Sequence, residues 1–311
     1  MPPPLHSLSR RRLLGGLLAA AAVSALPSRL ALAQTAEPLT RELPGTGVAL
    51  PRVGLGSWIT FNVGDDPVLL EACTAVMAAF FAEGGRLIDS SPMYGSSQAT
   101  IGHALKQLEA VERVYAADKV WTSNPAEGPA QIAASRQEWG IPRFDMLQVH
   151  NLLGWEGHLE TLMAMKASGD VRHLGITTSH GRRHDEVEHI MRQVPLDSVQ
   201  LTYNIVDREA EQRLLPLARE RGIGVIANRP FQRKRLIRHL EGKPLPPWAA
   251  EIHADTWAQF ILKFIISHPA VTCVIPATTQ VEHVRENLAA AREPLPDETM
   301  RRRMADYVRG L

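Results

Sequence analysis

Four side chains with complementary chemistry stand along the first half of this chain. Asp89 ends the short apolar run 86–88, and Tyr94 follows it after a loop that contains proline. Lys119 lies within AADKVWT, and His150 lies within DMLQVHN. If the four meet, Asp89 would keep Lys119 charged, and the ammonium would lower the pKa of the Tyr94 phenol. Tyr94 would then protonate a developing alkoxide, while His150 donates a hydrogen bond to the carbonyl oxygen.

Each of these residues also has a structural interpretation. Asp89 could cap the following turn, Tyr94 could be a rim aromatic, and the Lys119 side chain could extend to water. His150 taken alone is more typical of a structural histidine. Together they favour catalysis, because a carboxylate and an ammonium in a poorly hydrated mouth are costly unless they pair.

The elements that would position these residues follow an alternating pattern. Short apolar runs are each followed by a longer amphipathic segment, eight times between residues 52 and 291. Strands that alternate with helices pair in parallel, and eight such units close naturally into a barrel. The expected strands are 52–58, 86–90, 113–123, 144–151, 171–179, 197–205, 223–230 and 271–277.

The sequence therefore predicts an α/β fold, a (β/α)8 TIM barrel with an N-terminal hairpin plug. Chemistry in such barrels lies at the carboxyl ends of the strands, where all four residues are expected. A doubly wound open sheet is the rival, but Gly54–Trp58 lacks the third glycine of a phosphate-binding turn. Residues 38–51 read as a hairpin that turns at Pro44-Gly45 and lies under the barrel.

The first 33 residues read as an export signal. Arg10, Arg11 and Arg12 precede an apolar run from Leu13 to Leu26, and Ala31-Leu32-Ala33 forms a cleavage site. The arginines resemble the twin-arginine signal, so the twin-arginine export machinery is an expected partner and the periplasm the expected location. An ordinary secretory signal or a retained anchor is the alternative. Residues 34–311 would then form a single barrel domain without a stable membrane anchor.

Charge and cysteine content narrow the other function classes. The formal net charge is +1, which gives no bulk reason to expect nucleic acid as a partner. Cys73 and Cys273 are more consistent with two separate buried thiols than with one long-range disulfide. His180, His184 and His189 raise the idea of a metal, but they begin an exterior helix without partner acids. No metal site is predicted.

Several segments, in order and at the right distances, resemble the aldo-keto reductase family. The likeness runs from Gly54 to Leu288 and includes IDSSPMYGSS, ADKVW, LQVHN, KASGDVRHLGITT and VIPATTQVEHVRENL. The long stretch from VQLTYN to IANRPF is also similar to the family. The resemblance implies a nicotinamide cofactor, NADP with NAD possible, extended across the barrel mouth beside a small-molecule carbonyl substrate. Asp89, Tyr94, Lys119 and His150 would be the catalytic residues.

The resemblance also implies cofactor contacts. Gln200 would hold the carboxamide, and Glu286 with Asn287 would bind the adenine end. The full expected set is Gly56, Ser57, Trp58, Thr177, Thr178, Gln200, Asn228, Arg229, Pro230, Phe231, Thr278, His283, Glu286 and Asn287.

This chain departs from the family pattern at several of these positions. Thr177-Thr178 replaces the usual Ser-Asn, and Asn228 replaces a ring-stacking aromatic, so Arg229 or Phe231 would cover the ring. Ala277, Gln280 and His283 stand where cations often grip the 2′-phosphate, which weakens the preference for NADP. The long segment 228–248 carries many basic residues, and they suit either a solvated surface or a lid over phosphates or an anionic substrate.

The leading hypothesis is a reductase that transfers hydride from NAD(P)H to an aldehyde or ketone. The alternative is an exported nucleotide-binding or sensing protein of the same fold with little turnover. A barrel hydrolase lacks the paired rim carboxylates or metal cluster that it would need.

Overall fold

A closed ring of eight parallel strands organises the part of the chain that the computed structural model describes, residues 37–311. The ring runs β10-β9-β8-β7-β6-β5-β4-β3, and parallel bridges Val53–Val274 and Gly56–Ala277 join its two ends. The strands are β3 Leu55–Gly56, β4 Leu87–Asp89, β5 Tyr115–Val120, β6 Phe144–Val149, β7 Val171–Thr177, β8 Ser198–Thr202, β9 Gly224–Asn228 and β10 Val271–Val274. The predicted barrel is confirmed. The predicted signal peptide, residues 1–33, lies outside the described residues.

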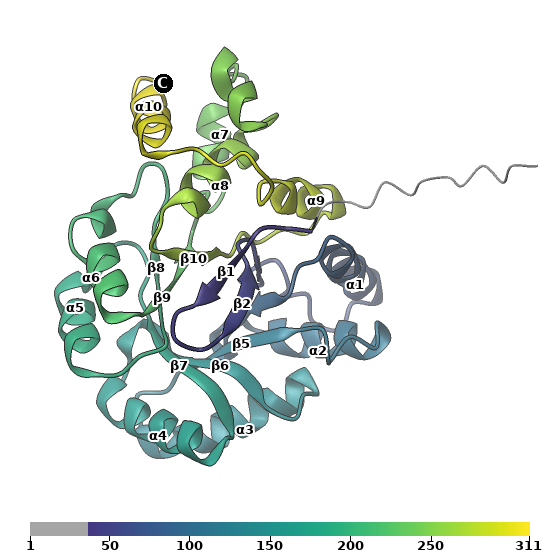
Figure 1. The fold of residues 1–311 in the computed structure, drawn as a ribbon. Helices are drawn as coiled ribbons and strands as arrows, with labels where there is room; N and C mark the ends of the chain where they lie inside the picture. The colour runs from purple at the N-terminus through teal and green to yellow at the C-terminus, as the bar shows by residue number, and fades with distance from the viewer. Residues whose placement is uncertain (1–36) are drawn as a thin grey trace, which may run out of the picture. The chain divides into compact units, whose positions relative to one another are not determined.

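Helices surround this ring, and each covers the outer face of the strands next to it (Figure 1). Local signals set their ends: Asp66 caps the first helix by accepting the N–H groups of Val68 and Leu69. The helices that follow the strands are α1 Pro67–Ala82, α2 Ser97–Gln107, α3 Gly128–Trp139, α4 Trp155–Ser168, α5 His184–Gln193, α6 Leu214–Arg221, α8 Trp257–Ser267 and α9 Val281–Ala289.

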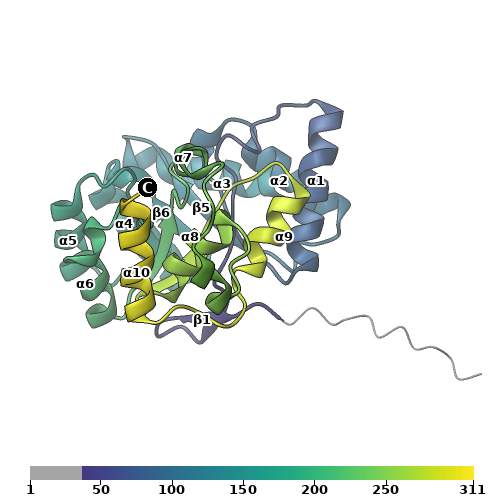
Figure 2. The same cartoon turned by 90° about the horizontal axis from the view of Figure 1, so that it is seen from above.

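The N-terminal hairpin closes one end of the barrel, as predicted. It consists of β1 Thr40–Leu43 and β2 Val48–Pro51, which pair antiparallel. Leu43 and Leu50 are fully buried with the interior side chains of the barrel, and Leu43 lies so close to Gly224 that a Cβ there would clash. Figure 2 shows the hairpin at the opposite end of the barrel from α7, Arg235–Leu240. The other end therefore stays open for a site.

Two segments are more regular than the sequence indicated. The long basic segment 228–248 contains α7 and the start of the 3₁₀ helix η5, Pro247–Ile252. The tail after residue 292 contains α10, Glu298–Arg309. Arg301 on α10 donates to the Tyr203 hydroxyl at 2.6 Å, and both side chains are buried. Tyr203 thus ties the tail to the barrel.

Both cysteines are free, and each is buried in a different part of the core, as predicted. Cys73 lies on α1 and Cys273 on β10. Within residues 37–311, no helix has the length and apolar character needed to cross a membrane.

Candidate active site

Three adjacent strands bring the predicted catalytic residues to the open end of the barrel. Asp89 is the last residue of β4, Lys119 lies near the end of β5, and His150 follows β6. Tyr94 ends the 3₁₀ helix η1, Pro92–Tyr94, and is held over them by that turn. The four side chains therefore meet, although up to 61 positions separate them in the sequence.

Asp89 and Lys119 form a buried ion pair. Lys119 Nζ donates to Asp89 Oδ2 at 2.6 Å and to the Ser90 carbonyl oxygen at 2.6 Å. Gln200 Nε2 donates to the other carboxylate oxygen at 2.7 Å. Burial alone would lower the pKa of Lys119, but Asp89 and Tyr94 outweigh it and raise the pKa. The pair is hydrogen-bonded on both sides, which is the condition for a buried charge to persist.

Tyr94 differs from expectation in one respect. Lys119 Nζ lies 5.2 Å from its ring centroid, close enough to stabilise a phenolate. Burial nevertheless raises the pKa of Tyr94 by more than Lys119 lowers it, and the Asp89 charge raises it further, so that the pKa of Tyr94 rises to about 12. Lys119 thus lowers the pKa as expected, but burial outweighs it, and Tyr94 is a neutral phenol that keeps its proton at neutral pH.

His150 packs edge-to-face against Tyr94, with ring centroids 5.6 Å apart. Burial, followed by the nearby Lys119 charge, lowers its pKa to about 3. The imidazole is thus neutral. Its Nδ1 lies 2.8 Å from Ser91 Oγ, and its ring also lines the cavity.

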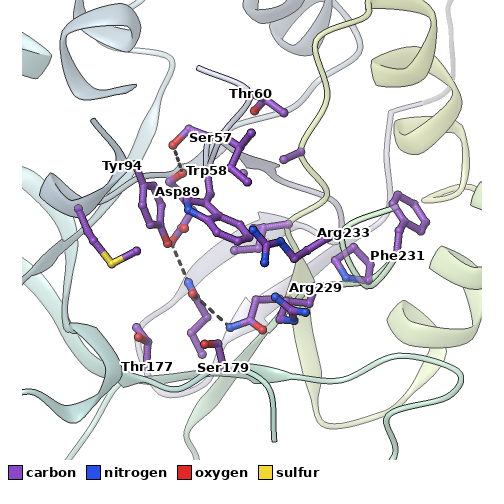
Figure 3. Close-up of a pocket in the computed structure, with 18 of the residues that line it drawn as sticks. Ser57, Trp58, Thr60, Asp89, Tyr94, Thr177, Ser179, Arg229, Phe231 and Arg233 are labelled. Atoms are coloured by element: carbon purple, nitrogen blue, oxygen red, sulfur yellow. Dashed lines mark hydrogen bonds between the residues drawn. The ribbon is translucent and has the colours of Figure 1, made fainter. Parts of the chain in front are cut away.

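A cavity of about 540 Å³ lies over these residues (Figure 3). Most of the predicted cofactor residues line it together with three of the predicted catalytic residues. The predicted residues in its lining are Gly56, Ser57, Trp58, Asp89, Tyr94, His150, Thr177, Thr178, Gln200, Asn228, Arg229, Pro230 and Phe231. The volume is typical of a small-molecule site.

The adenine-end residues and Lys119 lie outside this lining. Thr278 hydrogen-bonds His283 Nδ1 at 3.3 Å, at the turn from β10 to α9, and Glu286 and Asn287 follow on α9. Their neighbours Ala277 and Thr279 do line the cavity, so this group borders it. Lys119 is fully buried and reaches the site through Asp89 and Tyr94.

Gln200 and Asn228 are already engaged with protein groups. The Gln200 amide donates to Asp89 and, at 3.2 Å, to Gln148 Oε1. Asn228 donates to the Thr178 carbonyl oxygen at 2.9 Å and accepts from Thr202 at 2.8 Å. Gln200 consequently has only its oxygen left for a ligand, and Asn228 braces neighbouring strands.

The basic loop, residues 229–234, borders the cavity. Arg229, Arg233 and Lys234 have positive φ of 54°, 59° and 70°, in the left-handed region that non-glycine residues rarely occupy. Arg233 lies 4.2 Å over the Trp58 ring, whereas Phe231 lies away from Trp58 and Tyr94 (Figure 3). Phe231 packs against the core instead, so it does not cover this part of the cavity.

The charges of the basic loop are not neutralised by the protein. Within residues 37–311, Arg229, Arg233 and Lys234 form no salt bridge. Burial and the nearby Arg233 charge lower the pKa of Arg229. The arrangement suits a bound anion, which would offset this repulsion.

Some lining residues were missed by the sequence reasoning. They belong to turns without a regular pattern, and only proximity to a predicted residue could have pointed to them. They are Ile59, Thr60, Met93, Asn151, Ser179, His180, Ile275 and Thr279. In residues 37–311, no cluster of three metal-ligating side chains is present, including around His180 and His184.

The chain matches the Aldo/keto reductase family over residues 52–305. It is 30% identical to Methylglyoxal reductase YeaE of Escherichia coli over 78% of this chain and 86% of that protein. It is 26% identical to the NADH-specific methylglyoxal reductase of the same organism, over 84% and 96%.

Solved structures share the fold. An aldo/keto reductase from Klebsiella pneumoniae, in complex with NADP and acetate, superposes with a TM-score of 0.73 at 23% identity, over 85% of this chain and 94% of that chain. The thermostable aldo-keto reductase Tm1743 gives 0.71 at 27% identity, over 87% and 99%. The predicted function, NAD(P)H-dependent reduction of an aldehyde or ketone, is thus confirmed at the level of the family. The chain belongs to the aldo/keto reductase family.

Proposed function

We propose that Tyr94 is the proton donor of this reductase and that His150 orients the substrate carbonyl. The observation that carries the proposal is the edge-to-face contact of Tyr94 and His150 at the cavity wall, with the Lys119–Asp89 pair behind Tyr94. Bound NAD(P)H supplies the hydride to the carbonyl carbon. Tyr94 gives its proton to the carbonyl oxygen, and the nearby Lys119 stabilises the phenolate that results.

The residues of the cavity fit a nicotinamide dinucleotide. The Gln200 oxygen accepts a long hydrogen bond from Asn228 Nδ2 at 3.5 Å, and its second lone pair can accept one from a ligand at the catalytic end. The unpaired cations of the basic loop border the same cavity, and they suit an anionic dinucleotide. Arg229 of that loop would cover the ring side that Asn228 and Phe231 leave open. Thr278, His283, Glu286 and Asn287 would hold the adenine end.

The proposed cofactor is NADPH, with NADH as an effective substitute. A preference for the 2′-phosphate rests on cations, and Ala277 and Gln280 supply none. One relative is named as NADH-specific. Titration of the purified protein with each nucleotide, followed by protein fluorescence, would rank the two affinities.

The proposed substrate is a small, reactive carbonyl compound such as methylglyoxal, after the names of two relatives. Oxidation of NADPH or NADH in the presence of methylglyoxal tests the activity, with Tyr94→Phe as the matched variant. Turnover that Tyr94→Phe abolishes supports the proposal, and turnover that the variant retains contradicts it. Nucleotide binding without turnover of any carbonyl tested would favour the alternative, a binding or sensing protein.

We also propose that residues 1–33 direct twin-arginine export to the periplasm and are removed near Ala33, leaving 34–311 as one domain. Support comes from Arg10–Arg12, the apolar run that follows and the Ala31-Leu32-Ala33 site. Export of the folded chain would let it carry its cofactor outward. Replacing Arg11 and Arg12 together by lysine should keep the protein in the cytoplasm, and fractionation with terminal mass measurement checks both location and cleavage. Export that persists in this variant would contradict the twin-arginine route.

A further inference from the structure

A buried serine outside the cavity lining contacts the catalytic imidazole. Ser91 is fully buried, and its Oγ lies 2.8 Å from Nδ1 of His150. The same oxygen accepts the N–H of Met93 at 3.2 Å, which caps the turn that carries Tyr94. One side chain thus contacts both the histidine and the turn of the tyrosine.

The hydrogen atoms available to this contact allow one consistent arrangement. A serine hydroxyl has a single hydrogen, and no described residue other than His150 offers it an acceptor. If the hydroxyl donates to Nδ1, both the Ser91 hydrogen and the Nδ1 lone pair have a partner. If Nδ1 carried the ring hydrogen instead, the buried Ser91 hydrogen would have no partner, which proteins avoid.

The other ring nitrogen is left for the ligand. His150 is neutral because its pKa is lowered to about 3, so the imidazole carries one hydrogen only. Within residues 37–311, Nε2 has no hydrogen-bond partner, and His150 lines the cavity beside Tyr94. The hydrogen bond at one imidazole nitrogen determines which nitrogen is protonated.

We infer that Ser91 is a positioning residue that holds His150 as the Nε2–H tautomer. His150 then presents a hydrogen-bond donor, rather than a lone pair, to the substrate carbonyl oxygen. This inference rests on the proposed role of His150 in reduction. Because Ser91 also caps η1, the loop between Asp89 and Tyr94 aligns the proton donor and selects the histidine tautomer together.

The direct test reads the tautomer rather than the activity. The mature protein is labelled with nitrogen-15 histidine, and its imidazole nitrogens are recorded by NMR, with His150→Asn to assign the signals. We expect the Nε2–H pattern for His150 in the unaltered protein. In Ser91→Ala the pattern should shift toward a mixture of tautomers, with kcat for carbonyl reduction lower by roughly tenfold and nucleotide affinity unchanged.

Two further variants separate positioning from a general loss of packing. Ser91→Thr keeps the hydroxyl and should preserve the tautomer and most of the activity. Ser135→Ala removes a hydroxyl from an equally buried serine on α3 and should change neither. An Nε2–H signal that persists unchanged in Ser91→Ala would overturn the inference, even if activity fell, because the loss would then come from the turn.

The inference about Ser91 and the proposed function can be contradicted independently of each other. If the unaltered protein reduces no carbonyl, the proposed function fails, while the NMR pattern still decides the role of Ser91. If reduction is present and His150 carries its hydrogen on Nδ1, the inference about Ser91 is wrong and the proposed function stands. If Ser91→Thr does not fold, the spectra of the unaltered protein and of Ser91→Ala decide alone.

Discussion

The two sides of the cavity are built on different principles. On the side of β4 to β6, Asp89 and Lys119 are buried and hydrogen-bonded to each other. Gln200 donates a hydrogen bond to the second oxygen of the Asp89 carboxylate. On the side of β9, Arg229 and Arg233 project from a loop with left-handed backbone angles and form no salt bridge within the described chain. The charges of the catalytic side are paired before a ligand binds, whereas the basic loop carries charges that a bound anion would neutralise.

This difference separates chemistry from binding. Preorganised groups in a poorly hydrated site stabilise a reaction without further rearrangement, so the catalytic side should be rigid and intolerant of substitution. The cations at the rim attract anions, and salt screens this attraction. The basic loop should therefore tolerate substitution, and the binding that it supports should weaken as ionic strength rises.

The largest effect is expected from Tyr94→Phe. Loss of the proton donor should lower kcat for carbonyl reduction by about 10²- to 10⁴-fold, because phenylalanine has no hydroxyl to protonate the carbonyl oxygen. Steady-state kinetics measure kcat, and a nucleotide titration measures the affinity for the cofactor. Nucleotide affinity should change by less than about twofold, and a parallel loss of affinity would show that Tyr94 acts in binding.

Asp89→Asn should destabilise the fold as well as the chemistry. It leaves the buried ammonium of Lys119 without a counter-charge, which is expected to lower the free energy of unfolding by about 3–5 kcal/mol. Urea denaturation checks this. The matched control is Asp306→Asn in the exposed pair with Arg309, which should cost less than about 1 kcal/mol. Equal losses in the two variants would contradict the distinction between buried and exposed pairs.

Arg233→Gln should affect binding alone. Removing one cation beside a dinucleotide is expected to raise the dissociation constant about tenfold at low salt, and less at high salt. Fluorescence titrations at several salt concentrations measure it, with kcat unchanged within about threefold. Arg238→Gln, on the exposed face of α7 and outside the cavity lining, is the control. Similar losses in both variants would indicate a diffuse surface effect.

The smallest effect is expected from pH. With the pKa of His150 near 3 and that of Tyr94 near 12, neither group titrates between pH 5 and 9. The ratio kcat/KM should therefore vary by less than about twofold over that range. The free energy of unfolding should depend on pH through His150. Between about pH 6.5 and pH 3 the unfolded imidazole binds a proton that the folded one does not, so stability should fall as the pH drops from about 6.5 toward 3. An inflection of kcat/KM near pH 6.5 would show that His150 is hydrated.

Much of the site was predictable because its residues stand at strand ends. Period and length identified the eight strands, and the barrel then required Asp89, Lys119 and His150 to meet at one edge. The hairpin plug and the two separate thiols also followed from local pattern. Helix α10 was not predicted, although Asp297 caps it by accepting the N–H of Met300.

Other properties depend on contacts between distant parts of the chain. Spacing predicted that Lys119 would lower the pKa of Tyr94, and it does, but burial of the phenol outweighs this effect and the net pKa rises. Asn228 fills an expected cofactor position, yet Thr178 and Thr202 engage its side chain. Spacing also gave no sign that Ser91 reaches His150, 59 positions away.

The sequence by itself therefore determined which chemical groups reach the barrel mouth, because side-chain type and strand periodicity are local. The tertiary structure decided their protonation, their hydrogen-bond partners and the direction of the cations. Those properties depend on desolvation and on neighbours from other strands, and burial is a property of the assembled barrel rather than of any segment.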